Sequence, residues 1–268
     1  MIEETQDNQT NNEATPAMGK LKRRAFLQTA GIAAAGAAAG STLLNVAAAQ
    51  AQTETAAYPA PPQLSEKPLK PSIFETEGIS RKTHEEHFKL YQGYVKKSNE
   101  LLGKIAAVSR DPKDANQTYS EIRELKVELS FALGGVKNHE LYFDILGARS
   151  QPAGALLAEI NRSFGSPQAW AADLKATGLA ARGWVWTAYD YDLQRLMNYI
   201  GDTQNTYPIW NATPIVGLDV YEHAYYLDYG TRRADYIDAF LRNLNWNAIA
   251  ARFALASGPA GTLVTMEK

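Results

Sequence analysis

The stretch Asp219-Val220-Tyr221-Glu222-His223-Ala224-Tyr225-Tyr226 places a carboxylate and an imidazole four residues apart. A second carboxylate, Glu222, directly precedes the imidazole. The chain has only four histidines in 268 residues, so a histidine in this polar and aromatic segment is a candidate for a functional role. Carboxylate oxygens and imidazole nitrogens are both ligands of first-row transition metals. Asp219 and His223 are therefore candidate metal ligands, and their partners are sought among His84, His87 and His139.

The composition is that of an ordinary soluble globular protein. A length of 268 residues suffices for one large domain or two small ones. A net charge of −2 gives no basic excess that would indicate nucleic acid as a partner, and no polarised charge that would indicate stable membrane association. Cysteine is absent, which excludes disulfides, thiolate metal sites and cysteine nucleophiles. Any bound metal must have nitrogen and oxygen ligands.

Residues 1–51 have the pattern of an export signal. The run Lys22-Arg23-Arg24-Ala25-Phe26-Leu27 precedes a weakly hydrophobic stretch rich in Ala and Gly, and Ala49-Gln50-Ala51 fits a cleavage site. Paired arginines before such a stretch are typical of the twin-arginine pathway. A membrane anchor is the alternative, but the stretch is poor in Leu. We expect export through the twin-arginine translocon, a route that often carries folded proteins with their cofactor installed, to the periplasm or the medium.

The first half of the predicted mature chain is mainly helical. Residues 52–71 are Pro-rich and without periodicity, which predicts an extended arm or linker. Ser80 is a candidate helix N-cap, and apolar residues at helical spacing predict long helices over 83–104 and 119–146. Two long helices joined by a short loop form an antiparallel hairpin, which we assign to a domain of residues 72–150.

Residues 151–268 predict a small α/β domain. Two short helices are expected within 153–180, and helical sequence resumes from about Glu222 and includes 236–252. Aromatic and β-branched runs predict three strands, at 183–189, 195–200 and 215–220. The predicted fold class is α+β, with a long helical hairpin followed by a domain that holds a three-stranded antiparallel sheet.

His139 lies near the end of the second long helix, after the adjacent glycines Gly134 and Gly135. Each glycine inside a helix costs roughly 1 kcal/mol relative to alanine. That cost is tolerated where another element must approach closely, such as a ligand or a side chain of a site. A plain helix crossing with an incidental histidine is the alternative.

His84 and His87 share one face of the first long helix. Tyr94 follows His87 by seven residues, which places the two within about 20° of each other around the helix axis. Both side chains are then expected to point into the same pocket. His84 is the second choice of ligand, and we predict it to be solvated among Lys82, Glu85 and Glu86. Three histidines and one aspartate suit manganese or iron and leave a position for solvent.

With these residues in place, the chain resembles the iron/manganese superoxide dismutases. The segment from Asp219 to Tyr226 resembles the most specific motif of that family, and Asn138-His139 followed by aromatic residues resembles a second. The likeness covers about residues 70–255. Other matching motifs are Ile79-Ser80-x-x-Thr83 leading to His87, Gly183-Trp184-x-Trp186, and Asn245-Trp246.

The resemblance implies an enzyme that converts superoxide to O₂ and H₂O₂ by redox cycling of a mononuclear metal. It implies one Mn or Fe per subunit, a homodimer or dimer of dimers, and four ligands, His87, His139, Asp219 and His223.

The resemblance also implies roles around the metal. Tyr94 would be the gateway tyrosine, and Gln204 the glutamine that hydrogen-bonds metal-bound solvent. Gly135 matches the small residue that accompanies such a glutamine in manganese-type members, which favours manganese. Asn138, Trp184 and Tyr221 would complete the surroundings of the metal.

Two further residues are implied at a dimer interface. Glu222 would hold His223 of the partner subunit, and Tyr226 would lie beside it.

The chain departs from the family pattern at two places. The family usually has Trp where this chain has Tyr221, and a histidine expected between His87 and Tyr94 is missing, with Leu90 or Tyr91 in its place. Proton delivery and dimer geometry are expected to differ as a result.

Two rival functions follow from the same residues. An iron oxygenase with a two-histidine, one-carboxylate site is opposed by the third histidine. A catalytically weak metal-binding protein on the same scaffold is the other.

Overall fold

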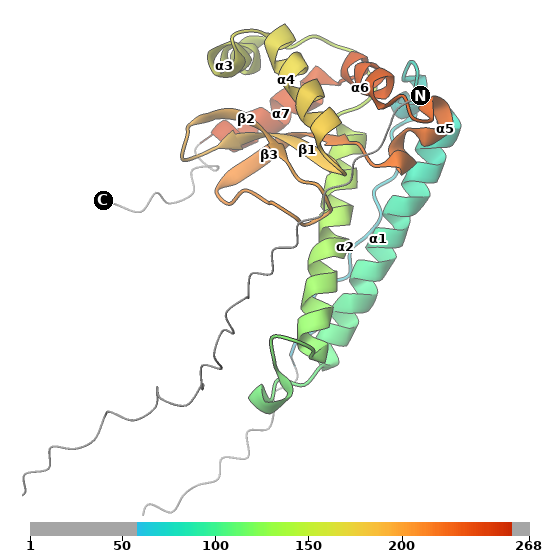
Figure 1. Ribbon diagram of the computed structural model, residues 1–268, viewed down its shortest axis with the longest axis vertical. Helices are drawn as coiled ribbons and strands as arrows, with labels where there is room; N and C mark the ends of the chain where they lie inside the picture. The colour runs from blue at the N-terminus through green and yellow to red at the C-terminus, as the bar shows by residue number, and fades with distance from the viewer. Residues whose placement is uncertain (1–57, 259–268) are drawn as a thin grey trace, which may run out of the picture. The chain divides into compact units, whose positions relative to one another are not determined.

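The computed structural model describes residues 58–258, and Figure 1 shows their arrangement. The predicted export signal and the start of the Pro-rich arm lie outside the described residues. None of the described helices is both long enough and apolar enough to cross a membrane. In chain order the elements are η1 (Pro71–Glu75), α1 (Arg81–Ala107), η2 (Pro112–Asp114), α2 (Glu121–Asp144), α3 (Gly154–Phe164), α4 (Pro167–Ala180), β1 (Trp184–Asp190), β2 (Arg195–Ile200), β3 (Ala212–Asp219), η3 (Glu222–Ala224), α5 (Tyr226–Tyr229), α6 (Arg233–Arg242) and α7 (Trp246–Ser257).

The two long helices α1 and α2 lie side by side and antiparallel, as the sequence predicts (Figure 1). Ser80 caps α1, because its hydroxyl oxygen accepts a hydrogen bond from the Thr83 N–H at 3.2 Å. Tyr91, Val95 and Leu101 recur at helical spacing on α1 and are buried. Tyr91 and Val95 belong to the main core, whereas Leu101 packs with Leu125 and Ala132 of α2 in a second cluster within the hairpin.

The sheet has the order β2-β1-β3 with antiparallel pairing throughout, which confirms the predicted α+β fold. The third strand begins at Ala212, earlier than predicted. Its pairing with β1 is irregular next to Pro214, a residue that has no N–H to donate to a ladder. The loop between β2 and β3 carries Gln204, which is buried.

Side chains alternate in direction along β3, and the Asp219 side chain points toward the helical hairpin. Successive side chains of a strand point to opposite faces of the sheet. Gly217 faces Leu141 of α2, whereas Leu218 faces Gly178 of α4 on the other side. Asp219 therefore shares the face of Gly217, and its carboxylate reaches the side on which α2 packs.

The predicted helical run 236–252 is wrong in one respect, because the chain breaks it between α6 and α7. The Asn243 side chain donates hydrogen bonds to the carbonyls of Ala239 and Glu77 and accepts one from the Glu77 N–H. The Asn245 side chain accepts from the Ala248 N–H and so caps α7. Asparagine side chains compete with the helix for backbone groups, which ends one helix and begins the next.

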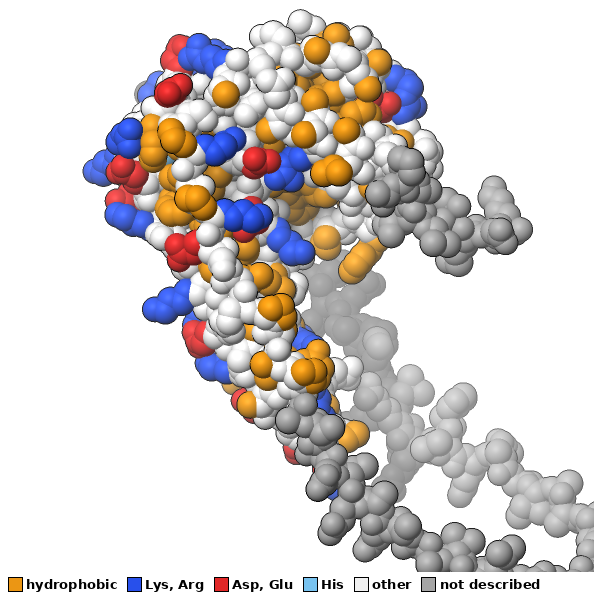
Figure 2. Space-filling view, turned by 180° about the vertical axis from the view of Figure 1, so that it is seen from behind, with side chains coloured by type: hydrophobic (Ala, Val, Ile, Leu, Met, Phe, Trp, Pro, Cys, Tyr) orange, Lys and Arg blue, Asp and Glu red, His pale blue; other side chains and the backbone are white. Residues whose placement is uncertain are grey.

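Charged side chains of both signs are interspersed over the face shown in Figure 2. They lie between smaller groups of apolar side chains, so this face carries no extended field of one sign. The mixture agrees with the small net charge of the chain.

Candidate metal centre

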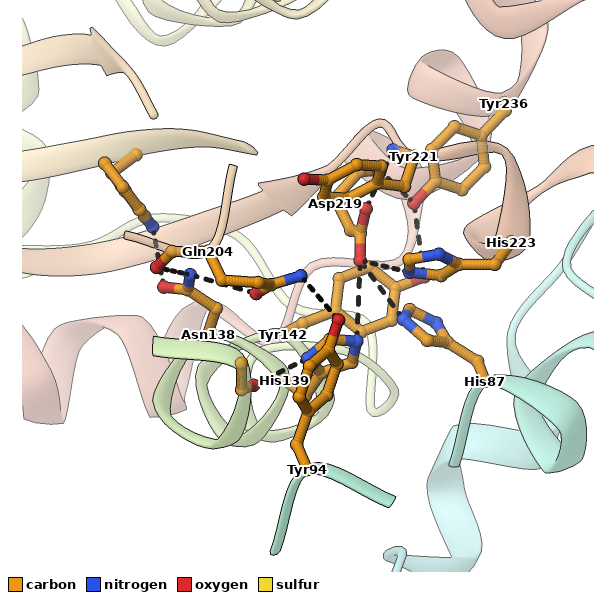
Figure 3. A network of polar contacts seen from close by, with 12 residues as sticks. His87, Tyr94, Asn138, His139, Tyr142, Gln204, Asp219, Tyr221, His223 and Tyr236 are labelled. Carbon is orange, nitrogen blue, oxygen red and sulfur yellow. Dashed lines mark hydrogen bonds and ion pairs between the residues drawn. The ribbon is translucent and has the colours of Figure 1, made fainter. Parts of the chain in front are cut away.

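The four residues predicted as metal ligands converge at one buried point (Figure 3). One ligand atom from each lies within 4.8 Å of the others. The Asp219 Oδ2 atom is 3.2 Å from Nε2 of His87, 3.1 Å from Nε2 of His223 and 3.8 Å from Nε2 of His139. The residues come from α1, α2, the end of β3 and η3, so the site forms only when hairpin and sheet domain are both folded.

Hydrogen bonds on the far side of two of these groups fix the atoms that face the centre. His139 Nδ1 lies 2.6 Å from the Gly135 carbonyl oxygen, and a carbonyl can only accept. Nδ1 therefore carries the proton, and Nε2 presents a lone pair to the centre. Asp219 Oδ1 accepts from the Tyr221 N–H at 2.9 Å, which leaves Oδ2 to face the three imidazoles.

The buried groups are in the protonation states that a cation needs. Burial lowers the pKa of His139 to about 3 and also lowers the pKa of His87, so both rings are neutral at pH 7. Burial opposes ionisation of Asp219, but the His223 and His87 imidazoles hold the pKa of its carboxyl well below the usual value. A buried carboxylate beside the neutral rings of His87 and His139 is costly without a positive partner. The donor set of three nitrogens and one oxygen therefore fits a manganese or iron ion.

A chain of amides leads from the sheet to Tyr94 (Figure 3). The Trp186 indole N–H donates to Asn138 Oδ1 at 3.1 Å, which turns the Asn138 amide nitrogen toward Gln204. That nitrogen contacts the Gln204 backbone carbonyl and Oε1 at 3.3 and 3.5 Å. Gln204 Nε2 then faces the Tyr94 hydroxyl at 3.4 Å. Because Tyr94 accepts from Gln204, its own proton is left for a group in the pocket.

The adjacent glycines make room for two different partners. A Cβ atom on Gly135 would lie 2.6 Å from the Tyr94 ring. A Cβ atom on Gly134 would meet the backbone carbonyl of Gln204. The sequence prediction linked Gly135 with the glutamine, whereas Gly134 is the glycine that adjoins Gln204. The reason is rotational, since neighbouring residues of a helix point about 100° apart.

Aromatic rings enclose the imidazoles. The Trp184 ring lies edge-on to His139 at 5.3 Å between centroids, and Tyr142 packs against His87 at 4.9 Å. Tyr221 stacks on His223 at 5.2 Å with a 20° angle between the rings. Burial, with Asp219 nearby, raises the pKa of Tyr221 to about 12, so the phenol stays protonated.

The prediction that His84 is solvated is wrong. Its side chain is fully buried, although Lys82, Glu85 and Glu86 around it in sequence are exposed. The turn before α1 covers it, and His84 Nε2 lies 2.7 Å from the Thr76 hydroxyl oxygen. It is not among the converging residues.

Sequence reasoning missed the support beneath Asp219. The Tyr236 hydroxyl donates to the Asp219 backbone carbonyl at 2.8 Å and lies 3.3 Å from the Tyr142 hydroxyl. Both tyrosines are fully buried. No spacing pattern in the sequence links them, because the contact joins α2, β3 and α6.

The predicted interface residues lie on the surface of the single chain. Glu222 is exposed, and Tyr226 is 50% exposed. Leu227, beside Tyr226, is similarly open at 55%.

Comparison with known proteins gives one consistent result. Residues 152–252 match the family model described as iron/manganese superoxide dismutases, C-terminal domain. The chain is 43% identical over 192 residues to the superoxide dismutase (Fe) of Aquifex aeolicus, which covers 70% of this chain and 89% of that protein. It is 35% identical over 194 residues to the superoxide dismutase (Fe) of Cupriavidus metallidurans, covering 71% and 96%. The superoxide dismutase (Mn) of Mycolicibacterium paratuberculosis is 33% identical over 183 residues, covering 66% and 86%.

Proposed function

This chain belongs to the iron/manganese superoxide dismutase family, and we propose that it works as an exported homodimer with one metal ion at the four converging side chains. The activity is the dismutation of superoxide, in which two superoxide anions and two protons give one O₂ and one H₂O₂. Relatives named superoxide dismutase align with nearly their whole length, at up to 43% identity.

We assign His87, His139, Asp219 and His223 as the ligands. The observation that carries the assignment is that three imidazole nitrogens face one carboxylate oxygen in a buried space. A manganese or iron ion held by these four side chains would supply one-electron redox chemistry for the two half-reactions of superoxide.

We propose manganese as the physiological metal. The support is the approach of Gln204 from the C-terminal half onto a helix that carries glycine at 134 and 135. The names of two relatives argue for iron. Metal analysis of protein purified from its native host is the test, and a predominance of iron would contradict manganese.

Tyr94 and Gln204 are proposed to handle protons. Burial, followed by the nearby Asp219 carboxylate, raises the pKa of Tyr94, so its hydroxyl stays protonated. Gln204 donates to the oxygen of that hydroxyl and thereby directs the Tyr94 proton toward an anionic oxygen species in the pocket. Tyr94, Tyr221 and His223 are the partly exposed members of the site, so superoxide is expected to enter beside them.

Homodimer formation is proposed through the surface that follows β3. Tyr226 and Leu227 are large, exposed and apolar, and Glu222 offers a carboxylate directly before the ligand His223. In a two-fold arrangement, Glu222 would hold His223 of the partner subunit. Replacing Glu222→Ala should shift sedimentation toward the monomer, whereas an unchanged dimer would contradict this interface.

Export is proposed from the sequence of residues 1–51, in particular the pair Arg23-Arg24. The double variant Arg23→Lys, Arg24→Lys should retain the protein in the cytoplasm, which cell fractionation measures. Normal export of that variant would contradict the twin-arginine route.

The function as a whole is tested with protein that begins at Gln52 and is loaded separately with manganese and with iron. Superoxide consumption is measured together with metal content, and the free ions serve as controls. We expect about one ion per chain and turnover far above the free ion with at least one metal. Stoichiometric metal without turnover would favour the alternative, a catalytically weak metal-binding protein.

A further inference from the structure

The described part of the Pro-rich arm, residues 58–70, lies extended against the helical hairpin (Figure 1). The Leu64 backbone forms two hydrogen bonds with the Asn99 side chain of α1, at 2.8 and 3.0 Å. Three residues after Leu64, the Lys67 backbone N–H donates to the Tyr91 hydroxyl at 2.9 Å. The arm is therefore bound to α1 through main-chain groups at two levels.

Tyr91 extends this contact to α2. Its hydroxyl accepts from the Lys67 N–H and donates to Glu140 Oε1 at 3.0 Å. The Tyr91 side chain is almost fully buried, and burial raises the pKa of its hydroxyl to about 12, so the proton needed for the second bond is always present. The Lys67 ammonium also pairs with Glu140, but it is 72% exposed, and exposed pairs contribute little. Arm, α1 and α2 thus meet at one hydroxyl group.

This junction lies beside the candidate metal ligands. Tyr91 is one helical turn after His87, and Glu140 directly follows His139. The Phe143 ring fills the space between them, with its centroid 6.3 Å from that of Tyr91 and 5.1 Å from that of His87. A displacement of Tyr91 would therefore be transmitted to His87 through one packed ring.

Leu64 and Leu69 of the arm pack against the core, whereas Lys67 between them is held by polar contacts. A cavity of about 300 Å³ lies there, lined by Lys67 and Lys70 of the arm and by Tyr91, Glu140, Phe143 and Arg252. Side chains around a cavity lack the dispersion contacts that close packing provides. The contacts of Tyr91 with Lys67 and Glu140 are therefore not backed by close packing at this level.

We propose that the arm is a clasp, which acts through Tyr91 and Asn99 to hold α1 against α2 and so slows the release of bound metal. The clasp has this role only if the proposed metal site binds an ion. Because His87 and His139 come from different helices, local separation of α1 from α2 pulls two ligands apart. Tyr91 is a positioning residue, since its hydroxyl contacts the arm and Glu140 but none of the four converging side chains.

The test measures the release of manganese from loaded full-length protein into excess chelator at neutral pH. Tyr91→Phe removes one hydroxyl and keeps the ring, and Asn99→Ala frees the arm about three helical turns away from His87. Each variant loses two hydrogen bonds, so both should release manganese at least about fivefold faster than the wild type, which is the factor for one ordinary hydrogen bond. Lys97→Ala, on an exposed face of α1 and paired with Glu100, is the matched control and should release at the wild-type rate.

The thermal stability of each metal-free variant is measured in parallel. A merely structural role would lower this stability and leave the release rate unchanged. Release at the wild-type rate from either folded variant overturns the clasp, and Asn99→Ala decides alone if Tyr91→Phe does not fold. If the proposed metal site were wrong, the wild type itself would take up no manganese, which distinguishes that outcome from failure of the clasp.

Discussion

Nε2 of His139 lies 3.8 Å from Oδ2 of Asp219, and neither a hydrogen bond nor another described residue satisfies that nitrogen, although both side chains are fully buried. Buried polar atoms that face each other without a bond raise the free energy of the folded state. A cation between them would accept a lone pair from each. The arrangement is therefore that of a site prepared for an ion.

Replacing Asp219→Asn tests that conclusion directly. The change removes the only carboxylate of the converging set and keeps the shape of the side chain. Metal affinity should fall by more than about 100-fold, the upper value for loss of a partner that merely supports a ligand. Metal per chain is measured after loading and desalting.

Asp228→Asn is the matched control for this substitution. Asp228 is a nearby carboxylate, but it accepts from the Ser80 N–H and the Thr83 hydroxyl instead of facing the centre. This variant should lose some stability and keep its metal. Full metal content in Asp219→Asn would contradict the assignment of the site.

Two helical glycines, Gly134 of α2 and Gly103 of α1, are expected to respond oppositely to alanine substitution. Gly134→Ala would push a methyl group into the Gln204 carbonyl, so the loop that carries Gln204 must move and its contact with Tyr94 is lost. We expect lower turnover with little loss of metal. Gly103→Ala, on α1, has nothing within 4 Å of the added methyl and should raise stability by up to about 1 kcal/mol. Turnover, metal content and unfolding temperature are measured for both.

Equal turnover in Gly134→Ala and the wild type would show that Gln204 does not need its present position. Destabilisation by Gly103→Ala would show that the control is unsuitable.

Tyr221 is expected to affect rate or metal preference more than metal retention. Tyr221→Phe preserves the ring that stacks on His223 and removes only the hydroxyl. Tyr221→Trp introduces a larger ring, and the Gly183 backbone already lies close to the tyrosine ring. Both variants should bind one ion per chain and differ from the wild type in turnover or in the ratio of manganese to iron taken up. Tyr119→Phe, at an exposed tyrosine that lies outside the proposed interface, is the control.

Loss of metal from Tyr221→Phe would contradict this expectation, since the hydroxyl would then be needed for retention.

The fold and the converging residues could be predicted because local patterns carry them. Helical spacing and the Ser80 cap locate α1, and a strand that ends in Asp219 followed by His223 places two of the four groups within five residues. The order of helices and strands then follows from helical spacing and from runs of aromatic and β-branched residues along the chain. Family likeness supplies the pairing of distant segments that periodicity does not.

The environment of each residue could not be predicted in the same way. Helical periodicity assigns His84 to a face of α1 but does not show which segment covers that face. In the structure, the segment that contains Thr76 covers it. The Tyr236 contact with the Asp219 carbonyl likewise depends on how α6 packs. Such contacts are set by tertiary structure, so the sequence of one chain leaves no local trace of them.

The burial of His84 leads to a pH dependence that can be separated from that of the metal ligands. The Thr76 hydroxyl donates to a backbone carbonyl, Ile73 or Ile79, so its oxygen accepts from the protonated Nε2 of His84. Nδ1 has no hydrogen-bond partner among the described residues. Protonation would place a buried N–H there without an acceptor. Burial, with His87 adding to it and Asp228 opposing it, lowers the pKa of His84 to about 4.

The sign of the effect follows from the proton balance. An unfolded histidine has a pKa near 6.5, so between about pH 6.5 and pH 4 the unfolded chain binds a proton at His84 that the folded chain does not. The free energy of unfolding should therefore fall as the pH drops through this window, by up to about 1.4 kcal/mol per pH unit from this one group. His84→Gln removes that contribution and leaves those of His87 and His139. Denaturant unfolding of the metal-free wild type and variant at pH 7 and pH 5 measures the difference in slope, and parallel pH profiles would show that His84 titrates normally.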